Sequence, residues 1–290
     1  MDYDLKLHDF QSLFSLKGKI AVITGGSRGL GLSAASAILQ AGAAKVYISS
    51  RKKSACDEAA AALNKLPGLA PGAKAISVPA DVASIESLRQ LVEAVNKDSP
   101  EGIDILMANA GATWGAPFDT HPDEAIAKVL DLNVRAVFNS VREFAPALQR
   151  RGSIADPSRV LVTGSVAGLG IGTLGKQGTY GYSASKAAVI HLSRNLAVEL
   201  GPRHIAVNSI APGFFPTKMS VGLLSMAEGG AEAVAKSNPM QRLGKPEDFA
   251  GCVVYLCSRA GSHVNGATLT VDGGAMWARG ELASVNNSKL

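Results

Sequence analysis

The stretch Thr24-Gly25-Gly26-Ser27-Arg28-Gly29-Leu30-Gly31 follows directly after a short apolar run at residues 19–23. Glycines at this point permit a tight turn and let the backbone approach a pyrophosphate closely. The helix expected next, at residues 30–41, presents its free N–H groups and its positive dipole end to the same anion. A glycine-rich turn alone is weak evidence. Its place between a first strand and a first helix makes it a strong indication of a nucleotide-binding α/β fold.

The rest of the chain alternates short apolar runs with amphipathic segments. We expect buried strands at 19–23, 46–49, 75–78, 103–108, 159–163, 205–210 and 268–271. Helical patterns between them include 30–41, 84–96, 123–148 and 182–200. This alternation predicts a Rossmann-type, doubly wound, mostly seven-stranded parallel sheet with helices on both faces.

The pattern fits a single domain at residues 18–275, preceded by an N-terminal extension at 1–17 and followed by a C-terminal tail at 276–290. Two stretches rich in Gly, Pro and Ser, at 151–158 and 213–246, are expected to be loops. The second is long enough to act as a lid over a site.

Composition excludes several classes of protein. Of the 290 residues, 47% are hydrophobic, which argues against disorder. No apolar run approaches the ~20 residues of a membrane span, and no secretory signal pattern is present. The net charge of +5 is spread along the chain, without the dense Lys/Arg block expected of a nucleic-acid binder.

The three cysteines have no metal-ligand spacing with a histidine, so we expect no metal site and a reducing compartment. His121, His191, His204 and His263 are interpreted as surface residues or satisfied helix residues.

The chain ends in Ser288-Lys289-Leu290, the tripeptide that a peroxisomal import receptor reads. The preceding residues 283–287 are small and polar, as an accessible signal requires. We therefore expect a peroxisomal location in a eukaryotic cell, and a cytoplasmic one otherwise.

The stretch Tyr182-Ser183-Ala184-Ser185-Lys186 carries the strongest catalytic signal. A tyrosine four residues before a lysine on a helix places the phenol and the ammonium on one face. The nearby cation is expected to lower the tyrosine pKa from its usual ~10, which suits proton transfer. Ser165, seventeen residues earlier, is placed to hold a carbonyl oxygen beside the phenol. The alternative is an ordinary helix face.

The residues after the second strand bear on the choice of cofactor. The strand ends Ile48-Ser49-Ser50-Arg51-Lys52, where an NAD site usually has an Asp or Glu that grips the ribose 2′-hydroxyl. Arg51 and Arg28 without a carboxylate suit a 2′-phosphate instead. The sequence therefore favours NADP(H); the alternative is that both arginines are solvated surface residues.

With the glycine loop and the Ser/Tyr/Lys trio in one chain, the sequence resembles the short-chain dehydrogenase/reductase family, single-domain branch, over residues 17–274. Asn109-Ala110-Gly111 at the end of the fourth strand, Asn133 in its helix and Pro212-Gly213 followed by Thr217 match further family motifs. Residues 109–116 and 164–168 look like the 3-oxoacyl reductases named for rhamnolipid biosynthesis. The resemblance and the two arguments above together give an expected cofactor site at Gly25, Ser27, Arg28, Leu30, Gly31, Ser50, Arg51, Asp81, Val82, Asn109, Ala110, Gly111, Tyr182, Lys186, Pro212, Gly213 and Thr217.

The resemblance also implies the catalytic roles. NADPH delivers hydride to a carbonyl carbon, and Tyr182 donates a proton to the oxygen. Lys186 lowers the tyrosine pKa and binds the nicotinamide ribose, and Ser165 orients the carbonyl. Asn133 anchors a water that links Lys186 to solvent, although it also suits the plain task of satisfying buried backbone groups.

These roles imply an NADP-dependent oxidoreductase that reduces a 3-oxoacyl thioester such as an acyl-CoA, or a biosynthetic ketone. Alternatives are an enoyl-CoA reductase, a secondary-alcohol dehydrogenase and, from another class, a non-catalytic NADP(H) sensor or scaffold. The family also implies a homotetramer packed through 123–148, 182–200 and the last strand. Two departures stand out. Ala108 replaces a common Asn, and the spacing from Ser165 to Tyr182 is a few residues longer, so residues 169–179 are expected to form a roomier loop beside the substrate.

Overall fold

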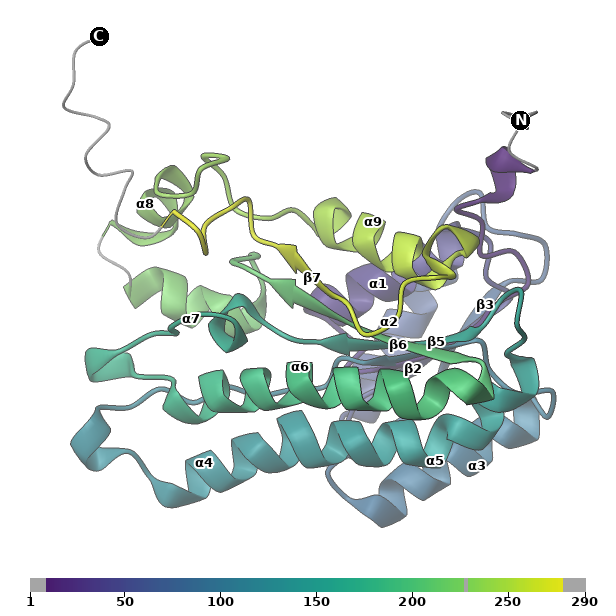
Figure 1. Ribbon diagram of the computed structural model, residues 1–290, viewed down its shortest axis with the longest axis horizontal. Helices are drawn as coiled ribbons and strands as arrows, with labels where there is room; N and C mark the ends of the chain where they lie inside the picture. Colours follow the sequence, from purple (N-terminus) through teal and green to yellow (C-terminus); the bar gives the residue numbers. More distant parts are fainter. Residues whose placement is uncertain (1–8, 227–228, 279–290) are drawn as a thin grey trace, which may run out of the picture.

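The computed structural model describes residues 9–226 and 229–278. Its seven strands form one parallel sheet in the order β3-β2-β1-β4-β5-β6-β7 (Figure 1). The sheet is extended first to one side of β1 and then, from β4 onward, to the other, so a crevice opens at the carboxyl ends of β1 and β4. This confirms the predicted Rossmann-type fold. The strands are β1 (Ile20–Thr24), β2 (Lys45–Ser49), β3 (Lys74–Ser77), β4 (Ile105–Ala108), β5 (Ser158–Thr163), β6 (Ile205–Pro212) and β7 (Thr268–Val271).

Helices cover both faces of the sheet and enclose two hydrophobic cores (Figure 1). Alternate residues of a strand point to opposite faces, so Val22 belongs to one core and its neighbours Ala21 and Ile23 to the other. One face carries α1 (Gly29–Gln40), α2 (Lys53–Leu63) and α9 (Pro246–Cys257), and the other carries α3 (Ile85–Asp98), α5 (Ala136–Arg151) and α6 (Tyr180–Leu200).

The single helix expected at 123–148 is interrupted. It consists of α4 (Asp123–Leu130), a π-helical turn at Asp131–Arg135, and α5. Such π turns inside helices occur frequently at functional sites, and here the turn contains the buried Asn133.

The expectation of a loop over 213–246 is wrong in part. Two helices, α7 (Lys218–Met226) and α8 (Gly230–Lys236), lie within it, and α9 begins at its end. At the start of α7, Ser220 Oγ accepts from the backbone N–H of Thr217 at 2.9 Å. Thr217 Oγ1 accepts in turn from the backbone N–H of Ser220 at 3.3 Å. This reciprocal capping satisfies N–H groups that a helix start leaves free.

Residues 13–16, within the expected N-terminal extension, contact the domain. Leu16 is fully buried, its N–H donates to the carbonyl of Ala41, and the Leu13 carbonyl accepts from Ala260. This part of the expected extension is therefore packed against the domain. In the described part of the tail, the Met276 N–H donates to Asp272. The tripeptide Ser288-Lys289-Leu290 lies outside the described residues.

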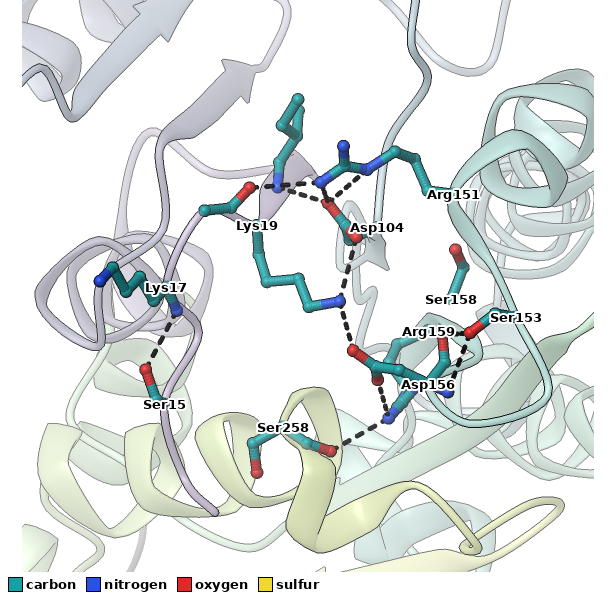
Figure 2. A network of polar contacts seen from close by, with 12 residues as sticks. Ser15, Lys17, Lys19, Asp104, Arg151, Ser153, Asp156, Ser158, Arg159 and Ser258 are labelled. Atoms are coloured by element: carbon teal, nitrogen blue, oxygen red, sulfur yellow. Dashed lines mark hydrogen bonds and ion pairs between the residues drawn. The ribbon is translucent and has the colours of Figure 1, made fainter. Parts of the chain in front are cut away.

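A polar network ties together the amino ends of the central strands (Figure 2). Asp104 pairs with Lys19 and Arg151, and Asp156 pairs with Lys19 and Arg159. Arg159 is 1% exposed, and its Nη2 also donates to the carbonyl of Ser258. Its Nε and Nη1 have no partner among the described residues. The network lies at the opposite end of the sheet from the crevice, so its role is structural.

No helix in the described ranges is long and apolar enough to cross a membrane. Within the same ranges, no group of three or more His, Cys, Asp and Glu side chains is placed to hold a metal ion.

Candidate active site

A cavity of about 430 Å³ opens at the carboxyl ends of the strands. Most of its lining comes from the loops after β1 to β6 and from the first turns of α6 and α7. A crevice at this edge, where the strand order reverses, is the usual ligand site of open α/β sheets. Its volume falls in the range of cofactor and small-molecule sites.

The glycine loop after β1 is packed too tightly for side chains at its turn. A Cβ atom at Gly31 would lie 2.3 Å from the Gly25 carbonyl oxygen and 2.5 Å from Asn109 Nδ2. Gly25 itself has φ +64°, which favours glycine. The backbone therefore runs close along the start of α1, as pyrophosphate binding at a helix N-terminus requires.

Asn109 connects the ends of three strands beneath this loop. Its Nδ2 donates to the carbonyls of Thr24 and Gly25, and its Oδ1 accepts from Thr163 Oγ1 at 3.0 Å. Thr24 Oγ1 accepts from the N–H groups of Asn109 and Ala110. The asparagine thus fixes the position of the loop relative to β4 and β5.

The adenosine end of the cavity is basic. Arg28, Arg51 and Lys52 line it, and neither arginine has a protein partner for its guanidinium within the described part of the chain. Ser50 donates to Ser27 Oγ at 2.9 Å, which links the end of β2 to the glycine loop. Asp81, after β3, is the only carboxylate among the described residues of the lining. Two free guanidinium groups without an acid at the end of β2 fit a ribose 2′-phosphate.

Ser165, Tyr182 and Lys186 come together on one side of the cavity. Ser165, Tyr182 and Lys186 all line the cavity, and Lys186 Nζ lies 5.6 Å from the centre of the tyrosine ring. Lys186 Nζ also donates to the carbonyl of Thr163 at 2.6 Å. A hydroxyl pair beside a buried ammonium is an arrangement that can hold a carbonyl oxygen and protonate it.

The electrostatics of the trio differ from the expectation. Burial raises the pKa of Tyr182 above its usual value, and the hydrogen bond from Ser165 only partly opposes this. Burial also lowers the pKa of Lys186, to about 8. The predicted lowering of the tyrosine pKa by Lys186 is therefore wrong for this structure, because desolvation outweighs the distant ammonium. A phenol that stays protonated at neutral pH is nevertheless the form that a proton donor needs.

Asn133 does not line the cavity. Its side chain bonds both backbone groups of Ala112, each at 2.9 Å, and donates to Ser185 Oγ at 2.9 Å. Ser185 in turn donates to the carbonyl of Tyr182 at 2.7 Å. The side chain thus joins the loop after β4 to the helix that carries the trio. This is the structural task foreseen as its alternative role, and the water-anchoring role stays a prediction.

Apart from Asn133 and Gly31, all of the residues expected at the site line the cavity. They are Gly25, Ser27, Arg28, Leu30, Ser50, Arg51, Asp81, Val82, Asn109, Ala110, Gly111, Ser165, Tyr182, Lys186, Pro212, Gly213 and Thr217. Sequence reasoning missed Ser49 and Thr113, which line the cavity with buried hydroxyl oxygens that have no protein partner. For Ser49, its place as the last residue of β2 was the available signal.

Comparisons with known proteins agree with this geometry. Residues 25–276 match the family model described as enoyl-(acyl carrier protein) reductase. The chain is 41% identical over 261 residues to the rhamnolipids biosynthesis 3-oxoacyl-[acyl-carrier-protein] reductase of Pseudomonas aeruginosa, which covers 90% of this chain and 97% of that one. It is 34% identical over 262 residues to a 3alpha-hydroxysteroid dehydrogenase of Mediterraneibacter gnavus. That match covers 90% of this chain and 98% of the dehydrogenase.

Among solved structures, the Pseudomonas aeruginosa RhlG/NADP active-site complex superposes with a TM-score of 0.82 at 40% identity, over 91% of this chain and 98% of that one. The fold and the site define an oxidoreductase with a Rossmann-type cofactor cleft. The chain belongs to the short-chain dehydrogenase/reductase family.

Proposed function

We propose that this protein is an NADPH-dependent ketoreductase that reduces the keto group of a 3-oxoacyl thioester. The observation that carries the proposal is that Ser165, Tyr182 and the buried Lys186 meet in one cavity with the glycine loop. A sensor or scaffold without turnover needs no buried hydroxyl pair next to an ammonium. The enoyl reductase alternative likewise has no need of a second hydroxyl that orients a carbonyl oxygen.

The residues of the cavity fit NADP(H). The glycine loop and the start of α1 would hold the pyrophosphate, Arg28 and Arg51 the 2′-phosphate, and Asp81-Val82 the adenine side. The bound cofactor would supply the hydride. The position of Lys186 against the Thr163 carbonyl leaves its other two N–H donors for a ligand in the cavity.

The protein groups then supply orientation and a proton. Ser165 donates a hydrogen bond to the substrate carbonyl oxygen and so polarises it. Tyr182 transfers its proton to the same oxygen as negative charge develops there. Lys186, whose pKa of about 8 leaves it mostly protonated at neutral pH, stabilises the phenolate that results.

The relatives support the choice of substrate and also a second one. The Pseudomonas aeruginosa enzyme is named for reduction of 3-oxoacyl groups on a carrier protein. The hydroxysteroid dehydrogenase, which matches over a similar length at lower identity, is named for a secondary alcohol on a ring system. The second candidate is therefore a cyclic ketone or the corresponding alcohol, handled by the same trio.

Replacing Tyr182 by Phe tests the proposal. Removing the proton donor is expected to lower kcat for ketone reduction by about a hundredfold to ten-thousandfold, while NADPH binding, followed by its fluorescence, stays unchanged. Tyr255→Phe, on α9 away from the cavity, is the matched control and keeps full turnover. Wild-type turnover in Tyr182→Phe would overturn the assignment.

Two further proposals concern the whole protein. We propose a homotetramer, supported by exposed apolar side chains on the helices expected to pack, Leu130, Phe138 and Val198. Sedimentation equilibrium is expected to give four times 29.8 kDa, and a monomer mass would refute it. We also propose peroxisomal import, supported by the sequence of Ser288-Lys289-Leu290.

A further inference from the structure

Cys56 is a buried thiol that contacts the adenosine end of the cavity from the side of α2. It lies in the first turn of that helix, is fully buried and does not line the cavity. Its Sγ lies 3.0 Å from Ser50 Oγ, directly after β2. Ser50 Oγ in turn donates to Ser27 Oγ in the glycine loop at 2.9 Å. We call Cys56, Ser50 and Ser27 the thiol–hydroxyl chain.

The thiol–hydroxyl chain has one direction of hydrogen bonding. A hydroxyl group has a single hydrogen to donate, and Ser50 gives its hydrogen to Ser27. The thiol of Cys56 is therefore the donor to Ser50 Oγ. The Ser50 carbonyl lies farther from the thiol, at 3.5 Å, and already accepts from the Ala80 N–H at 3.1 Å. Because Ser27 accepts from Ser50, the hydrogen of Ser27 is left for a ligand in the cavity that this residue lines.

The chain joins the two segments that carry the guanidinium groups of the cavity. Ser27 precedes Arg28 in the glycine loop, and Ser50 precedes Arg51 after β2. Both arginines line the cavity. The start of α2 adds to this positive end, because no side chain caps it and Ala55 of its first turn lines the cavity. A helix start of this kind has free N–H groups and a positive dipole end, and both favour an anion.

Ser49 gives a second, independent indication of a ligand at this end. It is the last residue of β2, is fully buried, and lines the cavity with an Oγ that has no partner among the described residues. A buried hydroxyl without a partner is costly unless a ligand or a water completes it. The adenosine end therefore offers positive charge and several hydrogen-bond donors, which suits a phosphate group.

Resting on the proposed NADPH-dependent function, we infer that Cys56 is a positioning residue for cofactor selection. Its donation to Ser50 holds the thiol–hydroxyl chain in the direction that leaves the Ser27 hydrogen for the 2′-phosphate. The same contacts keep the segments of Arg28 and Arg51 together. Hydrogen bonds in a chain also polarise one another, so a donor at the buried end strengthens the donor at the cavity end. NADH has a neutral hydroxyl in place of this phosphate, so the loss of the thiol weakens NADPH binding selectively.

The binding of two nucleotides tests this inference without turnover. Adenosine 2′,5′-bisphosphate carries the 2′-phosphate and 5′-AMP lacks it, and titration calorimetry gives the Kd of each. In Cys56→Ala, the Kd of the bisphosphate is expected to rise about three- to tenfold, the factor that one net hydrogen bond contributes, with the Kd of 5′-AMP unchanged within about twofold. Cys56→Ser keeps a donor at this position and is expected to retain the wild-type values.

Cys257→Ala is the matched control. Cys257 on α9 is as deeply buried as Cys56, but its thiol makes no hydrogen bond to any described residue. Its replacement removes a similar amount of packing and is expected to leave both Kd values unchanged. Steady-state kinetics give a second readout. In Cys56→Ala, KM for NADPH is expected to rise by the same factor as the Kd of the bisphosphate, while KM for NADH and kcat stay at the wild-type values.

A double variant tests whether Cys56 acts through Ser50. Ser50→Ala removes the middle of the chain and is expected to raise the Kd of the bisphosphate on its own. Adding Cys56→Ala is expected to raise it no further, because residues of one network are not additive. Additive effects would show that Cys56 acts by another route. Ser27→Ala changes only the cavity end of the chain and is expected to give the same selective rise; wild-type affinity for the bisphosphate in this variant would overturn the inference.

The outcomes separate this inference from the proposed function. If wild-type protein binds the two nucleotides equally, the NADPH preference fails and this inference fails with it, while Tyr182→Phe still tests ketone reduction. If wild-type protein prefers the bisphosphate and Cys56→Ala keeps that preference, or Cys56→Ser loses it as well, the inference is wrong and the proposed function stands.

Discussion

Arg28 and Arg51 are the residues at which we expect a single change to act most directly on cofactor choice. Both line the adenosine end of the cavity, with Asp81 as the one carboxylate of the described lining. The role of Arg51 can be predicted from the sequence, because the residues directly after the second strand contact the adenosine ribose of a bound dinucleotide.

Arg51→Glu is expected to lower the NADPH-over-NADH preference about tenfold to a hundredfold, since it removes one charge-assisted contact worth about 1.5–3 kcal/mol. The ratio of kcat/KM for the two cofactors measures it. Lys65→Glu, an exposed residue after α2, makes the same charge change as a control and is expected to leave the ratio unchanged. An unchanged ratio in Arg51→Glu would rule out the 2′-phosphate contact.

Also at the residue scale, Tyr182 shows that residue spacing predicts which side chains are neighbours but not how deeply they are buried. Helical spacing correctly predicts that Tyr182 and Lys186 share a face, but not that the phenol is buried deeply enough for its pKa to rise. Desolvation depends on everything packed around a group, and distant segments supply most of that packing. Asn133 is a similar case, because its partners Ala112 and Ser185 are set by how two loops and a helix meet.

At the scale of elements, strands and long helices were predictable and loops were not. The strands agree with the expected ranges to within two residues at each end, since buried parallel strands have continuous apolar runs. The π-helical turn at Asp131–Arg135 and the helices α7 and α8 were missed. The π-helical turn was missed because its apolar residues continue the helical spacing of the segments on either side. The helices α7 and α8 were missed because they are short and lie in a stretch rich in Gly, Ser and Pro.

The network in Figure 2 joins β1, β4 and β5 and gives a prediction for stability. Asp156→Ala is expected to destabilise the protein by about 3 kcal/mol, because it leaves the buried Arg159 without its carboxylate. Combining it with Arg159→Met is expected to recover most of this loss, since the buried charge is then gone as well. The free energy of unfolding in urea measures both variants.

The matched control is Asp57→Ala, which breaks an exposed pair with Lys53 and is expected to cost at most about 0.5 kcal/mol. A double variant that is no more stable than Asp156→Ala alone would show that the cost does not come from the unpaired guanidinium.

At the scale of the whole molecule, the proposed import signal Ser288-Lys289-Leu290 leads to a prediction that does not depend on the fold. Deleting Leu290 from a fluorescently tagged protein with a free C-terminus is expected to change its distribution in a eukaryotic cell from peroxisomes to cytosol, because the receptor reads the complete tripeptide. Fluorescence microscopy with a peroxisomal marker checks this. Changing Asn287 to Ala, outside the tripeptide, is expected to leave import intact; continued import without Leu290 would contradict the address.

The sequence by itself determined the parallel sheet, the glycine loop, the basic cofactor end and the Ser165–Tyr182–Lys186 trio. All of these depend on local spacing and on which residues follow a strand, and the order of parallel strands then brings them to one edge. Only the tertiary structure decided how deeply Tyr182 is buried, what Asn133 holds, and that Ser27, Ser50 and Cys56 form one hydrogen-bonded chain. Contacts of that kind arise from the packing of surfaces whose positions the whole sheet sets, so no local pattern of residues encodes them.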